Sequence, residues 1–177
     1  MDLPMNVPDI SQWLDSGGGR FGFQLAACVV CGGMVGIERQ LRGKAIGMRT
    51  SILICLATQV FVRLGLQLSA GVEATDPTRV VGQVVTGVGF LGAGVILARG
   101  DSITGVTSAA VVWMLAAIGS TIGAGFPKEA LLLSALVVSI LIVVRRLESA
   151  FIRLRGGSDE PEGAQPTSEP ASESSRR

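Results

Sequence analysis

A basic stretch between two apolar runs places the strongest constraint on the fold of this chain. The stretch, Glu38 to Thr50, contains four Lys or Arg residues. The flanking runs, Phe21 to Ile37 and Ser51 to about Leu68, contain a single charged residue, Arg63. About 18 apolar residues in a helix span the hydrocarbon core of a bilayer. The pattern therefore predicts two membrane-spanning helices joined by a loop that its cations hold on the cytoplasmic side.

Three further apolar runs extend the pattern. They cover Val80 to Ala98, Gly105 to Phe126 and Ala130 to Val144. Hydrophobic residues make up 48% of the chain and charged residues only 16%, which is more apolar than a usual soluble domain. We therefore expect an all-α, polytopic membrane protein in which residues 21–144 form a bundle of about five transmembrane helices.

The distribution of cations predicts the orientation of this bundle. Five spans place eleven Lys and Arg residues on one side and three on the other. Because cations near helix ends resist translocation, the richer side should be cytoplasmic. Residues 1–20 would then be periplasmic and residues 145–177 cytoplasmic. The region beyond Arg155 is rich in Ser, Pro and Glu, which predicts a disordered tail after a basic end.

Glycines are frequent, with 24 in 177 residues, and several recur at helical spacing. Gly32 to Gly36 and Gly119 to Gly123 show the small-xxx-small pattern that lets membrane helices approach closely. Packing within one chain and an interface of a homo-oligomer both fit this pattern.

Four glycines, Gly87, Gly89, Gly92 and Gly94, lie close together in the third span. Their G-x-G-x-x-G string resembles a dinucleotide-binding fingerprint. That fingerprint needs a preceding strand and a later acidic residue, so an apolar span does not fit it. The glycines predict either a close helix contact or a local break of the helix that lines a site.

The residues that usually carry catalysis or bind metal are scarce. The chain has no His, and no Asp or Glu falls inside the five predicted spans. We therefore expect no enzyme activity, no cofactor and no partner nucleic acid. Arg63 could reach the outer interface or act as a buried functional cation. Acidic residues at the membrane edges would have to bind any magnesium ion. Each of them could equally be an ordinary charge at the membrane interface. These edge candidates are Glu38, Glu73, Asp76 and Asp101.

Three motifs occur in the order found in one known family. The first combines Glu38-Arg39-Gln40 with Gly47-Met48-Arg49-Thr50, the second runs from Gln83 to Ile96, and the third runs from Ile103 to Ala110 and is followed by Trp113. Over roughly Gly22 to Gly125 the chain resembles the MgtC/SapB family of bacterial inner-membrane proteins. Many members continue into a soluble carboxyl-terminal domain, in whose place we expect the disordered tail.

The resemblance implies a role in magnesium homeostasis and in adaptation to low magnesium. Virulence-type members are linked to survival inside host cells and to restraint of the proton-driven ATP synthase. Spans without carboxylates favour a regulator that binds another membrane protein or a lipid of the bilayer. A small transporter or channel for magnesium or another ion, and a structural accessory subunit, are the alternatives. The residues expected on the functional surface are Glu38, Arg39, Arg42, Arg49, Thr50, Thr86, Gly87, Gly89, Phe90, Gly92 and Gly94.

Overall fold

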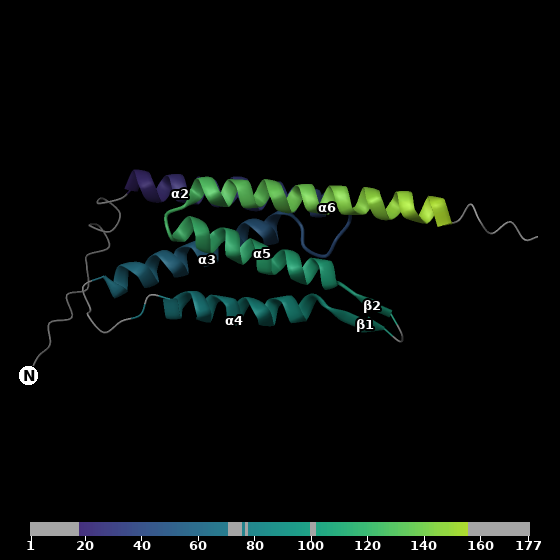
Figure 1. The fold of residues 1–177 in the computed structure, drawn as a ribbon. Helices are drawn as coiled ribbons and strands as arrows, with labels where there is room; N and C mark the ends of the chain where they lie inside the picture. The colour runs from purple at the N-terminus through teal and green to yellow at the C-terminus, as the bar shows by residue number, and fades with distance from the viewer. Residues whose placement is uncertain (1–17, 71–75, 77, 100–101, 156–177) are drawn as a thin grey trace, which may run out of the picture. The chain divides into compact units, whose positions relative to one another are not determined.

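The described part of the chain contains five long helices (Figure 1). The computed structural model describes residues 18–70, 76, 78–99 and 102–155. Each helix is long and apolar enough to cross a membrane, which confirms the expected all-α polytopic fold. The helices are α2 (Gly18–Leu41), α3 (Met48–Ser69), α4 (Thr78–Val95), α5 (Val106–Gly123) and α6 (Pro127–Arg155).

The chain divides into two compact units, Met1–Leu141 and Ile142–Arg177. The first contains α2 to α5 and the beginning of α6. The described residues of the second are the end of α6, where side chains are exposed from Val143 to Phe151.

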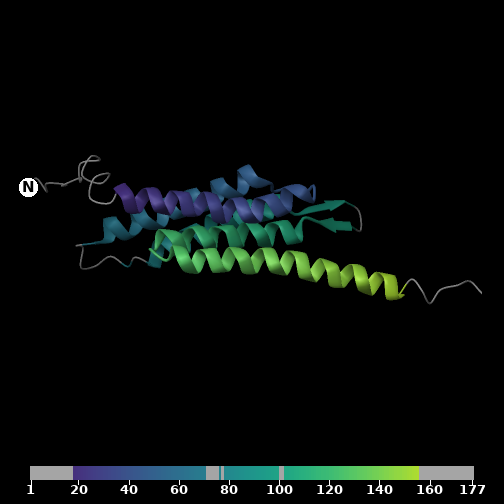
Figure 2. The same ribbon diagram turned by 90° about the horizontal axis from the view of Figure 1, so that it is seen from above.

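The core of the first unit forms where α3 packs between α2 and α5. These helices lie side by side with α4 in both ribbon views (Figures 1 and 2). Half of the apolar window of α5 is buried, against 17% of that of α4. The helix α5 is therefore central, whereas α4 packs through one face. The largest fully buried apolar side chains are Leu115, Ile118, Ile122, Val35, Val62 and Val112.

Glycines bring the backbones of α2 and α5 into contact with α3. A Cβ atom on Gly36 would lie 2.5 Å from the Cα of Met48, and one on Gly119 would lie 2.5 Å from the carbonyl oxygen of Cys55. Gly32 and Gly123 approach α3 almost as closely. Both small-xxx-small pairs thus serve packing within one chain, which was one of the two expected uses.

The connection between α4 and α5 is a short β-hairpin rather than the expected extension of the third span. The helix α4 ends at Val95, and β1 (Leu97–Arg99) pairs antiparallel with β2 (Ser102–Thr104), with Leu97 opposite Thr104. Because β2 runs back toward α4, the next residue, Gly105, lies against the end of that helix. Gly105 has a φ of 92°, and a Cβ there would lie 2.1 Å from the carbonyl oxygen of Val95. A glycine is therefore required at this corner.

Candidate functional site

The basic stretch begins inside α2, not in a loop as the sequence predicted. The polar residues Glu38, Arg39 and Gln40 are compatible with helical structure, and α2 continues through them to Leu41. The helix ends where Gly43 adopts a left-handed conformation with a φ of 61°. The N–H of Lys44 donates to the carbonyl of Arg39, and the N–H of Gly43 donates to that of Gln40. These two bonds form a Schellman motif, a common helix ending that favours glycine.

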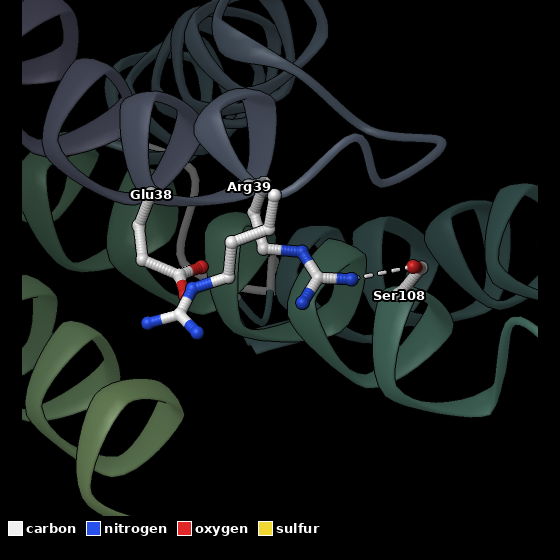
Figure 3. A network of polar contacts seen from close by, with 4 residues as sticks. Glu38, Arg39 and Ser108 are labelled. Atoms are coloured by element: carbon white, nitrogen blue, oxygen red, sulfur yellow. Dashed lines mark hydrogen bonds and ion pairs between the residues drawn. The ribbon is translucent and has the colours of Figure 1, made fainter. Parts of the chain in front are cut away.

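Glu38 and Arg39 are buried, with exposed fractions of 7% and 3%. Arg39 reaches across to α5, where its Nη2 donates a hydrogen bond of 2.6 Å to the Oγ of Ser108 (Figure 3). Glu38 forms an ion pair with Arg42, four residues further along the chain and just beyond the end of α2. The expectation of a cytoplasmic surface that includes Glu38 and Arg39 is therefore wrong for these two side chains, because the last turn of α2 points them into the bundle.

Lys44 and Arg49 are the exposed cations of the stretch, while Arg42 is half-buried.

Gln40 organises the start of α3, a role that its place in the first motif did not indicate. Its Oε1 accepts a hydrogen bond of 3.2 Å from the N–H of Met48. This contact satisfies an N–H group at the start of α3, where the N-cap Gly47 offers no side-chain oxygen. No sequence signal marked Gln40 as a cap, because its partner lies on another helix.

A groove runs between α3 and α4 and collects several of the expected residues. It has a volume of about 580 Å³ and includes Thr50 and Gly87. A smaller cavity of about 320 Å³ continues from it toward the α2–α3 loop and includes Gly94. Thr50, Ile54 and Leu91 line both cavities, so the two are adjacent. The sequence did not predict this groove, which depends on the pairing of α3 with α4.

The remaining candidates on α4 differ in their surroundings. Gly92 is buried and makes ordinary contact with Ala109 of α5. A Cβ atom on Gly87, Gly89 or Gly94 would meet no atom within 4 Å. The helix is α-helical from Thr78 to Val95, so the expected local break is absent there. No described residue of this chain makes the expected close contact at these three glycines. Thr86 and Phe90 are exposed, and the Thr86 hydroxyl donates to the carbonyl of Gly82 on its own helix.

A second polar cluster joins α2, α3 and α5 near the other end of the bundle. Gln24 donates to the carbonyl of Ile122 and accepts hydrogen bonds from Gln59 and Arg63. The guanidinium of Arg63 also lies 4.9 Å from the ring centre of Phe21. Arg63 thus connects α2 and α3, and together with Gln24 it also lines a cavity of about 350 Å³.

The edge acids share no site among the described residues. Asp76 is exposed, and its Oδ1 accepts hydrogen bonds from the hydroxyl and the N–H of Thr78. The hydroxyl of Thr78 and then its N–H lower the pKa of the Asp76 carboxyl, because both bonds favour the ionised form. Glu73 and Asp101 lie outside the described residues. In the described part of the chain, no group of three or more His, Cys, Asp or Glu side chains could hold a metal ion.

Comparison with known proteins identifies similar membrane proteins. A sequence model described as MgtC family matches residues 25–150. YhiD of Escherichia coli, whose name proposes a magnesium transporter, is 41% identical over 128 residues, covering 70% of this chain and 59% of YhiD. Protein MgtC of Brucella abortus is 34% identical over 139 residues, covering 77% of this chain and 57% of that protein. The chain thus spans less than two thirds of these relatives. No solved structure matches it.

Proposed function

The chain belongs to the MgtC family, and we propose that it is an inner-membrane regulator that binds another membrane protein during adaptation to low magnesium. The proposal rests on the outward face of α4. Gly82, Thr86, Gly89 and Ala93 recur at positions i, i+4, i+7 and i+11, so they share one face of the helix. All four are exposed.

This face suits contact with another helix. Lipid tails are as apolar as Leu, so small residues that permit close backbone approach, rather than apolar area, distinguish a helix interface in a membrane. A Cβ atom on Gly82 or Gly89 would meet no atom of another described segment within 4 Å. Phe90, 81% exposed, lies beside the stripe and could insert between the side chains of a bound helix.

The polar groups of the bundle support regulation over transport. Transporters present polar ligands toward a pathway at membrane depth. Here Arg39 donates to Ser108, and Gln24 donates to the carbonyl of Ile122. Gln59 in turn donates to Gln24. These bonds connect helices within the chain, which is a structural use of the polar groups.

Growth in low magnesium tests the proposed face. We expect Gly89→Leu to impair growth at unchanged abundance, because four added carbons would hold a bound helix away. Gly22→Leu is the matched control, since Gly22 on α2 is exposed and its Cβ would also meet no atom within 4 Å. Equal growth of the two variants would refute the α4 face. The family resemblance makes the ATP synthase the first partner to test by co-purification.

Magnesium uptake distinguishes the alternatives. Liposomes that contain the purified chain should take up Mg²⁺ no faster than empty liposomes. Faster uptake would overturn the regulator and favour the transporter. Normal growth of a deletion strain in low magnesium would instead remove the link to magnesium altogether.

A further inference from the structure

The groove between α3 and α4, hereafter the α3–α4 groove, has a definite direction. One end lies at Val80, in the first turn of α4, whose side chain lies within 2.8 Å of the position that a Cβ on Gly65 would take. Beyond the other end, the smaller cavity extends past Gly94 to Ala45 and Ile46 in the α2–α3 loop. The groove therefore runs from the start of α4 toward the membrane edge where the basic stretch lies. The residues that line the larger part are Thr50, Leu53, Ile54, Ala57, Thr58, Phe61, Val80, Gln83, Val84, Gly87, Val88 and Leu91.

The length of the groove matches one leaflet of a bilayer. From Thr50 to Phe61 the wall formed by α3 rises by about 17 Å, at roughly 1.5 Å per residue. Half of a hydrocarbon core of about 30 Å is about 15 Å. An extended chain that enters at the loop end could thus lie against α3 from Thr50 to Phe61, over about the length of one leaflet.

The walls are suited to an acyl chain. Most of the lining side chains are aliphatic or aromatic. The hydroxyl of Thr58 already donates to the carbonyl of Ile54, so it presents no unmet donor. Gly87 provides room, because its Cβ position is open.

The positive charge at the end of the groove nearest the α2–α3 loop favours a lipid with an anionic headgroup. Lys44 and Arg49 are exposed there. Arg49 precedes Leu53 by one helical turn, so both residues lie on the same side of α3, beside the groove. Exposed Lys and Arg at a membrane surface attract anionic lipids.

We propose that the α3–α4 groove binds one acyl chain of an anionic phospholipid, whose phosphate headgroup contacts Arg49 and Lys44. The site lies on a different face of α4 from the small-residue stripe. The proposal therefore does not depend on whether the chain is a regulator or a transporter.

Native mass spectrometry of the full chain in detergent, titrated with phosphatidylglycerol or phosphatidylcholine, tests this site. We expect one phosphatidylglycerol to bind more tightly than phosphatidylcholine. Gly87→Leu and Gly94→Leu fill the groove, and each should weaken phosphatidylglycerol binding by about tenfold or more. Gly89→Leu is the matched control: it adds the same side chain to the same helix outside the groove, and it should bind as the unmodified chain does. Circular dichroism verifies that each variant is folded. If one of the two groove variants does not fold, the other still tests the site.

A second pair of variants tests the headgroup contact. Arg49→Gln should weaken phosphatidylglycerol binding by about fivefold, as expected for one cation beside an anionic headgroup, and leave phosphatidylcholine binding unchanged. Arg79→Gln, at the opposite end of the groove, should change neither. Equal binding of the two lipids, or equal affinity of the groove variants and Gly89→Leu, would overturn the proposal. If the unmodified chain forms a dimer that only the groove variants disrupt, the lipid proposal is likewise overturned, and the groove binds a second copy of the chain.

Discussion

At the residue scale, Arg39 and Arg49 show how differently two cations of one stretch can act. Arg39 is 3% exposed and is hydrogen-bonded to Ser108 on α5. Arg49 lies in the first turn of α3 and is exposed. A buried, charge-assisted hydrogen bond contributes to stability, whereas an isolated surface charge contributes little.

We therefore predict that Arg39→Gln lowers the free energy of unfolding by about 1.5–3 kcal/mol, because the bond to Ser108 is lost or weakened. Arg49→Gln should change it by less than about 0.5 kcal/mol. Unfolding of the purified variants in mixed micelles, followed by circular dichroism, measures both values. Similar stability of the two variants would show that the Arg39 contact contributes nothing.

Asp76 gives a prediction about protonation. Its folded-state pKa lies below the ordinary value, first because of the hydroxyl of Thr78 and then because of the N–H of Thr78. The stabilising effect of this carboxylate should be complete above about pH 4 and should disappear as the pH falls through the lowered pKa. Thr78→Val removes the hydroxyl and should raise the pKa of Asp76. Carboxyl ¹³C NMR measures the change, and an unaltered pKa would contradict the assigned cause.

At the element scale, the glycines divide by what surrounds them. Gly36 lies against the backbone of α3, and a Cβ atom there would approach the Cα of Met48 to 2.5 Å. The Cβ position of Gly89 on α4 has no atom of another described segment within 4 Å. Both belong to similar small-residue patterns, so their spacing alone does not distinguish a contact within the chain from an open face.

We predict that Gly36→Ala destabilises the bundle by about 1–3 kcal/mol, because α2 and α3 must move apart. Gly89→Ala should be neutral or stabilising by up to about 1 kcal/mol, since Ala is the better helix former and the space is open. Thermal unfolding in detergent compares the two. A loss at Gly89 as large as that at Gly36 would contradict the open face of α4.

The five helices were predictable because each depends on a local run of apolar residues. The end of α2 was not, because Glu38 and Arg39 end the apolar run while Gly43 ends the helix. The burial of Arg39 depends on the position of Ser108, which lies 69 residues away. The groove likewise depends on how α3 and α4 pair. Sequence patterns thus indicate which residues enter the membrane, but contacts between distant segments decide which of them face inward.

At the scale of the whole molecule, orientation is the property that cation distribution predicts most directly. The eleven Lys and Arg residues that the five predicted spans place on one side include those in the last turns of α6 and beyond it, whereas three lie on the other side. Such an imbalance should place the α2–α3 loop and the carboxyl terminus in the cytoplasm.

A reporter fused after Arg155 tests this orientation. We expect a fluorescent protein that folds only in the cytoplasm to be active there, and an alkaline phosphatase that needs the periplasm to be inactive. The same pair fused after Ala70, which follows α3, should give the opposite result. Phosphatase activity after Arg155 would invert the predicted topology.

The position of α3 between α2 and α5 has a consequence for biogenesis. The sulfur of Cys55 donates to the carbonyl of Leu115, and Gly119 lies against Thr58, so the side of α3 that faces α5 is covered only after α5 has been synthesised. During translation α2 and α3 enter the bilayer first, and one side of α3 then borders lipid or the insertion machinery. The core therefore cannot close helix by helix. Its completion waits for a segment that emerges from the ribosome some sixty residues later, and a nascent chain that stalls before α5 has an unfinished membrane surface for quality control to recognise.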